Sequence, residues 1–87
     1  MWIYILQSLK NGRYYIGSSK DVKVRLNEFH NKGKVKATKY QRPWIIVFKQ
    51  KCKSETIAKQ IEVKLKSFKS RRITENIVFS GNCNLIM

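Results

Sequence analysis

The chain has 87 residues, and its 19 Lys and Arg against five Asp and Glu give a formal net charge of +14. A chain this short forms one domain with a thin core, and a hydrophobic content of 43% excludes a disordered protein, so we expect residues 1–87 to fold as one unit. The basic excess predicts a polyanionic partner. Nucleic acid is favoured over a membrane because no apolar run is long enough to span a bilayer. The competing explanation is that the charge aids solubility or follows from a lysine-rich genome.

A β-hairpin is predicted at the start of the chain. Residues 2–6 and 13–17 are rich in β-branched and aromatic side chains, and Asn11-Gly12 is the strongest turn signal between them. Side chains alternate across a pleated strand, so Tyr4 and Tyr15 each have a defined face. Whether the two tyrosines meet depends on the register of the hairpin, which the sequence leaves open.

A helix over about residues 21–29 is predicted next. Ser18 and Asp21 resemble a capping box at its start, and Arg25 lies at the edge of its apolar stripe. The apolar stripe consists of Val22, Leu26 and Phe29. Asn31 and Gly33 suit the end of the helix.

The second half of the chain predicts a buried strand and two helices. Pro43 bars a helix, and residues 44–48 have the apolar run of a well-buried third strand. Ser54 suits the N-cap of a helix over about residues 55–68. A last helical piece covers about residues 69–77. The tail, 78–87, is equally compatible with a short strand or a disordered end.

Few residues are available as a catalytic or metal-binding carboxylate. Glu62 lies beside the apolar stripe of its helix, where an acidic residue is unusual unless it has a functional role. A structural salt bridge to Lys59 or Lys66 is the alternative, and position alone does not decide between them. The other acids are assigned to helix starts or to the surface: Asp21, Glu28, Glu55 and Glu75.

Taken singly, the other candidates are weak. Tyr4 and Tyr15 could be core tyrosines with solvated hydroxyls, Arg25 a surface arginine and His30 a helix-end residue. Their order along the chain carries more information than any one of them.

In that order, the residues resemble the signature of the GIY-YIG endonuclease family over about residues 2–77. The likeness is strongest to small stand-alone bacterial members, similar to the N-terminal nuclease domain of the excision-repair endonuclease. The segments that carry it are Trp2-Ile3-Tyr4, Tyr15-Ile16-Gly17, Arg25-Leu26, His30-Asn31-Lys32-Gly33, Arg42-Pro43-Trp44, and Glu62 with Lys64, Lys66 and Ser67.

The resemblance implies an α+β fold with a small three-stranded antiparallel sheet flanked by helices. It also implies single-step, metal-dependent hydrolysis of DNA. In that mechanism Tyr4 is the general base, and Tyr15 orients water or phosphate. Arg25 offsets the charge that grows on the phosphate, while His30 assists proton movement or holds the base. Glu62 binds one divalent ion, Mg²⁺ or Mn²⁺. Because an unperturbed phenol has a pKa near 10, nearby cations such as Arg25 and the metal would have to favour the phenolate.

Two departures from the family pattern are visible. Trp2 stands where the family often has glycine. Arg25 and His30 are five residues apart, whereas four is usual, and on an α-helix one extra residue turns a side chain by roughly 100°. Either the helix ends or bulges near Phe29, or His30 is not where the family places its histidine.

Two basic segments are predicted to contact the phosphates of a nucleic acid, which supplies affinity without sequence choice. Two solvated basic faces are the alternative explanation. The segments consist of Lys32, Lys34, Lys36, Lys39 and Arg42, and of Lys64, Lys66, Lys69, Arg71 and Arg72.

The sequence therefore favours a DNA endonuclease of repair or recombination, cytoplasmic and nucleoid-associated in a bacterium. RNA as substrate and a targeting protein partner stay open. A non-catalytic nucleic-acid-binding module that keeps the fold is the alternative, and a ribosome-type basic protein would explain the charge but not the tyrosines.

Cys52 and Cys83 lack the spacing of a zinc site, and we expect two reduced thiols.

Overall fold

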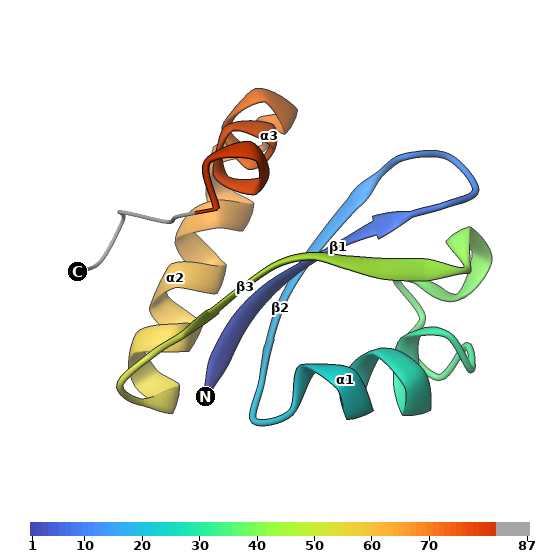
Figure 1. The fold of residues 1–87 in the computed structure, drawn as a ribbon, viewed down its shortest axis with the longest axis horizontal. Helices are drawn as coiled ribbons and strands as arrows, with labels where there is room; N and C mark the ends of the chain where they lie inside the picture. Colours follow the sequence, from blue (N-terminus) through green and yellow to red (C-terminus); the bar gives the residue numbers. More distant parts are fainter. Residues whose placement is uncertain (82–87) are drawn as a thin grey trace.

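A three-stranded antiparallel sheet forms the middle layer of the molecule in the computed structural model, which describes residues 1–81 (Figure 1). The strand order is β2-β1-β3, and the predicted α+β class is confirmed. The elements in chain order are β1 (Trp2–Ser8), β2 (Tyr14–Ser19), α1 (Val22–Val24), η1 (Arg25–His30), η2 (Lys39–Gln41), β3 (Trp44–Lys51), α2 (Glu55–Phe68) and α3 (Arg71–Ser80).

The central strand is β1, which pairs with both neighbours and is the most deeply buried. The prediction of a well-buried third strand is wrong, because β3 is an edge strand. Of its residues only Trp44 and Phe48 are buried, and Ile45 is 40% exposed. A continuous apolar run was therefore a poor guide to burial on both faces.

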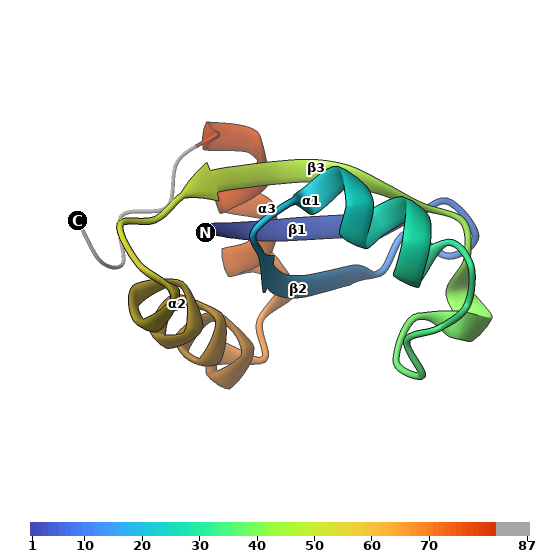
Figure 2. The same ribbon diagram turned by 90° about the horizontal axis from the view of Figure 1, so that it is seen from below.

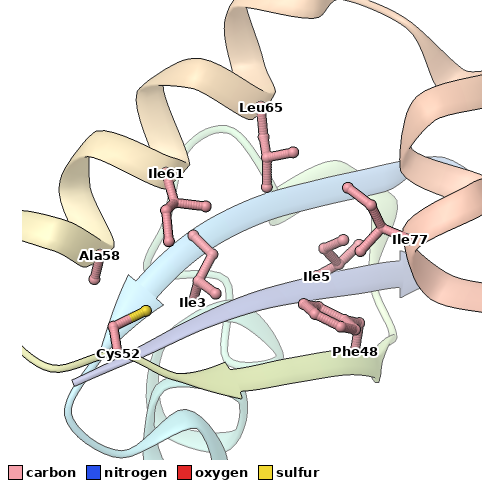
Figure 3. Close-up of a cluster of buried hydrophobic side chains, with 8 residues drawn as sticks. All are labelled: Ile3, Ile5, Phe48, Cys52, Ala58, Ile61, Leu65 and Ile77. Carbon is pink, nitrogen blue, oxygen red and sulfur yellow. The ribbon is translucent and has the colours of Figure 1, made fainter. Parts of the chain in front are cut away.

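Helices cover both faces of the sheet (Figures 1 and 2). Helices α2 and α3 pack on the face that carries Ile3 and Ile5, and α1 with η1 packs on the opposite face, which carries Tyr4 and Leu6. The alternation of side chains along β1 divides the apolar residues between these two cores. Figure 3 shows the first core, made of Ile3, Ile5, Phe48, Cys52, Ala58, Ile61, Leu65 and Ile77.

Helix α2 has the predicted bounds and the predicted cap, since the Ser54 side chain accepts a hydrogen bond from the Ile57 amide. The last helix begins later than predicted. Lys69 adopts the left-handed conformation (φ 49°) that ends α2, and Ser70 then caps α3. Because α3 continues to Ser80, part of the unassigned tail is helical.

The first helix differs from the prediction in its cap. Asp21 is the N-cap, and its carboxylate accepts from the Val24 amide, whereas Ser18 belongs to β2. The predicted capping box is therefore wrong: β2 runs on to Ser19, which places Ser18 in the sheet.

Within residues 1–81, no helix is both long and apolar enough to cross a membrane. Cys52 is a buried free thiol, as predicted, and Cys83 lies outside the described residues.

Candidate active site

The hairpin register places the two tyrosines on the same face of the sheet. Tyr4 is directly opposite Gly17, and Leu6 is directly opposite Tyr15. Directly opposed residues of an antiparallel pair share a face, so both phenols belong to the face covered by η1. His30 lies beside both of them: its ring centroid is 5.9 Å from that of Tyr4 and 5.0 Å from that of Tyr15.

A π-helical turn brings Arg25 and His30 to the same site despite their unusual spacing. Arg25 still begins in the α-helical pattern, since its amide donates to Asp21 O. The next turn is wider: the Asn31 amide donates to Leu26 O, five residues back, at 2.8 Å. A π-helix inserts one residue into a turn, so residues five apart take the relation of residues four apart on an α-helix. The bulge predicted near Phe29 is therefore present, and His30 reaches the tyrosines.

Buried hydrogen bonds connect Tyr4, His30 and Thr38. Tyr4 Oη is 2.8 Å from His30 Nε2, and His30 Nδ1 is 3.0 Å from Thr38 Oγ1. The exposed fraction is 2% for Tyr4 and 0% for both His30 and Thr38. Burial raises the pKa of Tyr4 to about 12, and the charge of Tyr15 adds to the effect, while Arg25 opposes it. Burial and then the nearby Arg25 lower the pKa of His30 to about 4.

These shifts fix the resting protonation state of the pair. At neutral pH Tyr4 is a phenol and His30 is an uncharged imidazole. Arg25 alone does not make Tyr4 a phenolate, because the desolvation of Tyr4 outweighs its influence. That Arg25 and a bound metal together favour the phenolate stays a prediction. A proton must therefore leave Tyr4 during any reaction in which it acts as a base.

Arg25 lies close to Tyr4 and His30. Its guanidinium is close enough to influence the pKa values of both Tyr4 and His30, and its Cζ lies 4.6 Å from the centroid of the Phe29 ring. Its Nε is buried and has no hydrogen-bond partner among the described residues. A buried donor without an acceptor is costly, so this Nε is an unsatisfied group of the candidate site.

Glu62 reaches the same region from the other face of the sheet. Its Oε1 accepts a hydrogen bond of 2.6 Å from the Ser18 hydroxyl, next to Gly17 on β2. Its Oε2 is 2.8 Å from Lys66 Nζ, which lies 5.3 Å from the centroid of the Tyr15 ring. Burial opposes the charge of Glu62, but the hydrogen bonds from Lys66 and Ser18 outweigh it and lower its pKa. The carboxylate is thus ionised, and its charge acts on the hydroxyl of Tyr4.

The salt bridges expected as the structural alternative for Glu62 are also present, with Lys59 at 3.7 Å and Lys66 at 2.8 Å. They do not account for its whole environment, since the Glu62 side chain is only 15% exposed and an additional donor comes from β2. Its burial and its hydrogen bond to β2 distinguish Glu62 from an acid on a solvated helix face.

Within the described part of the chain, Glu62 is the one carboxylate of the candidate site that could contribute a ligand to a divalent ion. Residues 1–81 contain no group of three or more His, Cys, Asp or Glu side chains that would enclose a metal. Mg²⁺ is commonly held by one or two carboxylates together with water and substrate phosphates, and Glu62 supplies one such ligand. Lys66 would have to release Oε2 before both carboxylate oxygens could serve.

The ten predicted phosphate-binding residues are all exposed, but they are not equivalent. Lys66, Lys69 and Arg71 line a groove of about 420 Å³ between β2 and helices α2 and α3, and this groove reaches Tyr15. Arg13, which the sequence did not single out, lines it as well. In the first segment Arg42 is engaged locally, because its guanidinium donates to Lys39 O at 2.8 Å.

The contacts of three supporting residues were not predicted from the sequence. Ser18 was interpreted as a cap but holds Glu62. Thr38 sits in a loop and contacts His30. Asn31, expected to end the helix as part of the family-like segment, accepts from the Trp44 amide at 2.7 Å and donates to the Trp44 carbonyl at 3.1 Å, which fixes η1 to β3. Each role depends on long-range pairing that local patterns do not encode.

Comparison with known proteins gives one match. The family model of the GIY-YIG catalytic domain matches residues 1–76. Neither the curated proteins nor the solved structures contain a significant match to the chain. The matched range includes every candidate site residue, although α3 continues beyond it to Ser80.

Proposed function

Because this chain belongs to the GIY-YIG family of nuclease domains, we propose that it is a metal-dependent endonuclease that hydrolyses DNA phosphodiester bonds. The observation that carries the proposal is the convergence on strand β2 of two phenols, an imidazole and a carboxylate from opposite faces of the sheet. A binding module would need the basic surface but not this arrangement.

In the proposed reaction, Tyr4 and His30 move the proton of the attacking water together. The water gives a proton to Tyr4 Oη as the phenol gives its own proton to His30 Nε2, 2.8 Å away. Tyr4 therefore acts as a base without first existing as a free phenolate. Tyr15, whose ring lies against His30, would orient the water or the phosphate.

Arg25 would neutralise the charge of the phosphate and would also influence the pKa of His30. Its charge contributes to the low pKa of His30 in the protein alone. A bound phosphate would compensate that charge, so the pKa of His30 would rise when substrate is present. The imidazole would then accept a proton more readily in the complex than in the free protein.

The divalent ion would be held by Glu62. When bound, it would stabilise negative charge on the phosphate and the leaving oxygen. Ser18 would keep the carboxylate in place through its hydrogen bond to Oε1. Lys66 would exchange Oε2 for a phosphate oxygen, since its side chain is 45% exposed and can move.

The DNA strand would enter along the groove between β2 and helices α2 and α3. Arg13, Lys66, Lys69 and Arg71 line this groove, and Tyr15 is also among its lining residues. Contacts of this kind hold the backbone without reading bases, so little sequence preference is expected. A role in DNA repair or recombination in a bacterial cytoplasm is compatible with such an activity, and RNA remains a substrate to be tested.

A plasmid-nicking assay tests the proposal. Supercoiled DNA would be incubated with wild-type protein in Mg²⁺, Mn²⁺ or EDTA, and with Tyr4→Phe, Arg25→Ala and Glu62→Ala. We expect nicking by the wild type only with a metal, and a loss of roughly 10²- to 10⁴-fold in Tyr4→Phe. Tyr40→Phe is the matched control, because Tyr40 is 74% exposed and remote from catalysis in the proposed mechanism. Nicking by Glu62→Ala that still depends on metal would refute the metal assignment, and DNA binding without cleavage of any substrate would favour the binding module.

A further inference from the structure

Thr38 is a fully buried polar residue in the loop between η1 and β3, and it is hydrogen-bonded to the imidazole of the candidate site. Nothing in the family resemblance assigned it a role. Its hydroxyl lies between His30 Nδ1 at 3.0 Å and Val35 O at 3.3 Å. Since buried polar groups need partners, the directions of these hydrogen bonds can be derived from their donors and acceptors.

The direction follows from Tyr4. Its buried hydroxyl has one proton to donate. Among the described residues, His30 Nε2 at 2.8 Å is the acceptor within hydrogen-bond distance, the guanidinium of Arg25 is a donor, and Tyr15 and Glu62 act on the hydroxyl through their charges. A guanidinium only donates, so the proton of Tyr4 goes to His30 Nε2, which must carry a lone pair. An uncharged imidazole with a lone pair on Nε2 carries its hydrogen on Nδ1.

The same chain of bonds continues through Thr38. His30 Nδ1–H donates to Thr38 Oγ1, and the Thr38 hydroxyl donates to the Val35 carbonyl. Every donor in this series has an acceptor. In the opposite arrangement Thr38 would donate to Nδ1 and Nε2–H would donate to Tyr4, which leaves the Tyr4 proton without an acceptor among these groups.

The backbone holds Thr38 in position. Its carbonyl accepts from the indole Nε1 of Trp44 at 2.9 Å and from the Gln41 amide at 3.2 Å. Its amide donates to Val35 O at 3.1 Å. The hydroxyl is therefore fixed relative to strand β3, and Trp44 in turn packs against Tyr15, with ring centroids 6.3 Å apart.

We infer that Thr38 is a positioning residue that keeps His30 in the Nδ1–H form, so that Nε2 is free to accept the proton of Tyr4. The catalytic consequence rests on the proposed nuclease function, but the tautomer itself is a property of the protein alone. Thr38 acts through His30 and does not touch the reacting phosphate.

The test uses the fact that His30 is the single histidine of the chain. ¹⁵N-edited NMR spectra of histidine-labelled protein at neutral pH distinguish a protonated Nδ1 from a protonated Nε2 without assignment ambiguity. We expect the wild type to show Nδ1–H, Thr38→Ser to preserve it, and Thr38→Val to shift the population toward Nε2–H. In nicking assays, kcat of Thr38→Val should fall roughly 10- to 100-fold with KM unchanged, while Thr38→Ser recovers most of the rate.

A wild-type spectrum with Nε2–H would overturn the inference, and so would an unchanged tautomer and kcat in folded Thr38→Val. If Thr38→Val does not fold, the spectra of the wild type and Thr38→Ser decide. An Nδ1–H spectrum in a protein that cleaves no nucleic acid would support the role of Thr38 in setting the tautomer and refute the proposed nuclease function alone.

Discussion

Gly17 lies directly opposite Tyr4 in the hairpin, with no room for a side chain between them. A Cβ built on Gly17 would be 2.5 Å from Tyr4 Oη and 2.6 Å from Tyr4 Cζ. Tyr4 is buried and hydrogen-bonded to His30, so it cannot move aside freely. The absence of a side chain at Gly17 is therefore what lets the phenol lie across β2.

Replacement of Gly17 by alanine should displace Tyr4 and inactivate the protein. We expect Gly17→Ala to lower the free energy of unfolding by about 1–3 kcal/mol, the usual cost of overpacking, and to abolish nicking. Urea unfolding and the plasmid assay measure the two effects. Gly81→Ala is the control: a Cβ there has open space, and its positive φ should cost only about 1 kcal/mol without loss of activity. Full activity in Gly17→Ala would show that Tyr4 is not needed where the structure places it.

Deletion of Asn27 should be tolerated. Asn27 is an exposed residue of the π-helical turn, and its removal would let η1 continue as an ordinary α-helix with Arg25 four residues before the histidine. We expect the deletion variant to fold and to retain nicking within about tenfold. Deletion of Gln60, an exposed residue of α2, is the matched control. It should unfold the protein, because it turns the rest of the helix by roughly 100° and moves Ile61 and Leu65 out of the core. Thermal unfolding of the two variants distinguishes these outcomes, and equal damage in both would contradict the role given to the wide turn.

Stability should fall between pH 6.5 and about pH 4.5 because of His30. The fold lowers the pKa of this residue from 6.5 to about 4, so in that window the unfolded chain binds more protons than the native protein. The free energy of unfolding must then rise with pH, and at pH 7 it should exceed the value at pH 4.5 by on the order of 2 kcal/mol. Above pH 6.5 the histidine contribution is constant. Urea titrations across the range measure the slope, and His30→Gln should remove it. A slope that persists in this variant would have to come from the carboxyl groups instead.

Glu62→Gln should show whether activity depends on the negative charge of Glu62 or only on its hydrogen bond to Ser18. A glutamine can still accept from the Ser18 hydroxyl, but it attracts a divalent ion far less. We expect nicking to fall by at least about 100-fold with only a small change in stability. Mn²⁺ should broaden the amide signals of residues around Glu62 in the wild type and leave them sharp in the variant. Glu28→Gln, which removes an exposed ion pair with Lys32, is the control for the loss of a negative charge.

The groove beside Tyr15 should account for part of the salt dependence of DNA binding. Lys69→Gln removes one cation of the groove. The slope of log affinity against log salt should therefore become shallower by about 1, the change expected for the loss of one phosphate contact. Lys53→Gln lowers the net charge by the same amount on an exposed residue that is absent from the groove lining, and its slope should match the wild type. Fluorescence anisotropy with a labelled duplex at several salt concentrations provides the comparison. Identical slopes in all three proteins would place the bound strand elsewhere.

Elements governed by local signals were predictable from the sequence. Helix α2 has the bounds and the Ser54 cap that its stripe of apolar residues and its capping residue indicated. The strands were located to within a few residues for the same reason. The family resemblance then identified the residues that meet at the site, because their order survives when their individual signals are weak.

What could not be predicted depends on contacts between distant segments. The hairpin register decides that Tyr4 and Tyr15 share a face. Ser18 resembled a helix cap because its spacing from Asp21 fits that pattern. In the structure it pairs with Ile3 in the sheet instead, and Asp21 caps the helix. Thr38 gave no signal, since a threonine in a basic loop shows its importance only when the loop folds back onto His30.

The wide turn between Arg25 and His30 also matters for recognising distant relatives of this protein. The number of residues between two side chains does not fix their relative position in a helix, because a π-helical turn can accommodate one inserted residue and leave the flanking residues in the same relation. A search motif with a rigid gap of three residues between the arginine and the histidine would pass over this chain. Motifs for this segment should therefore let the gap vary by one, and they should be checked against the three-dimensional relation of the two side chains.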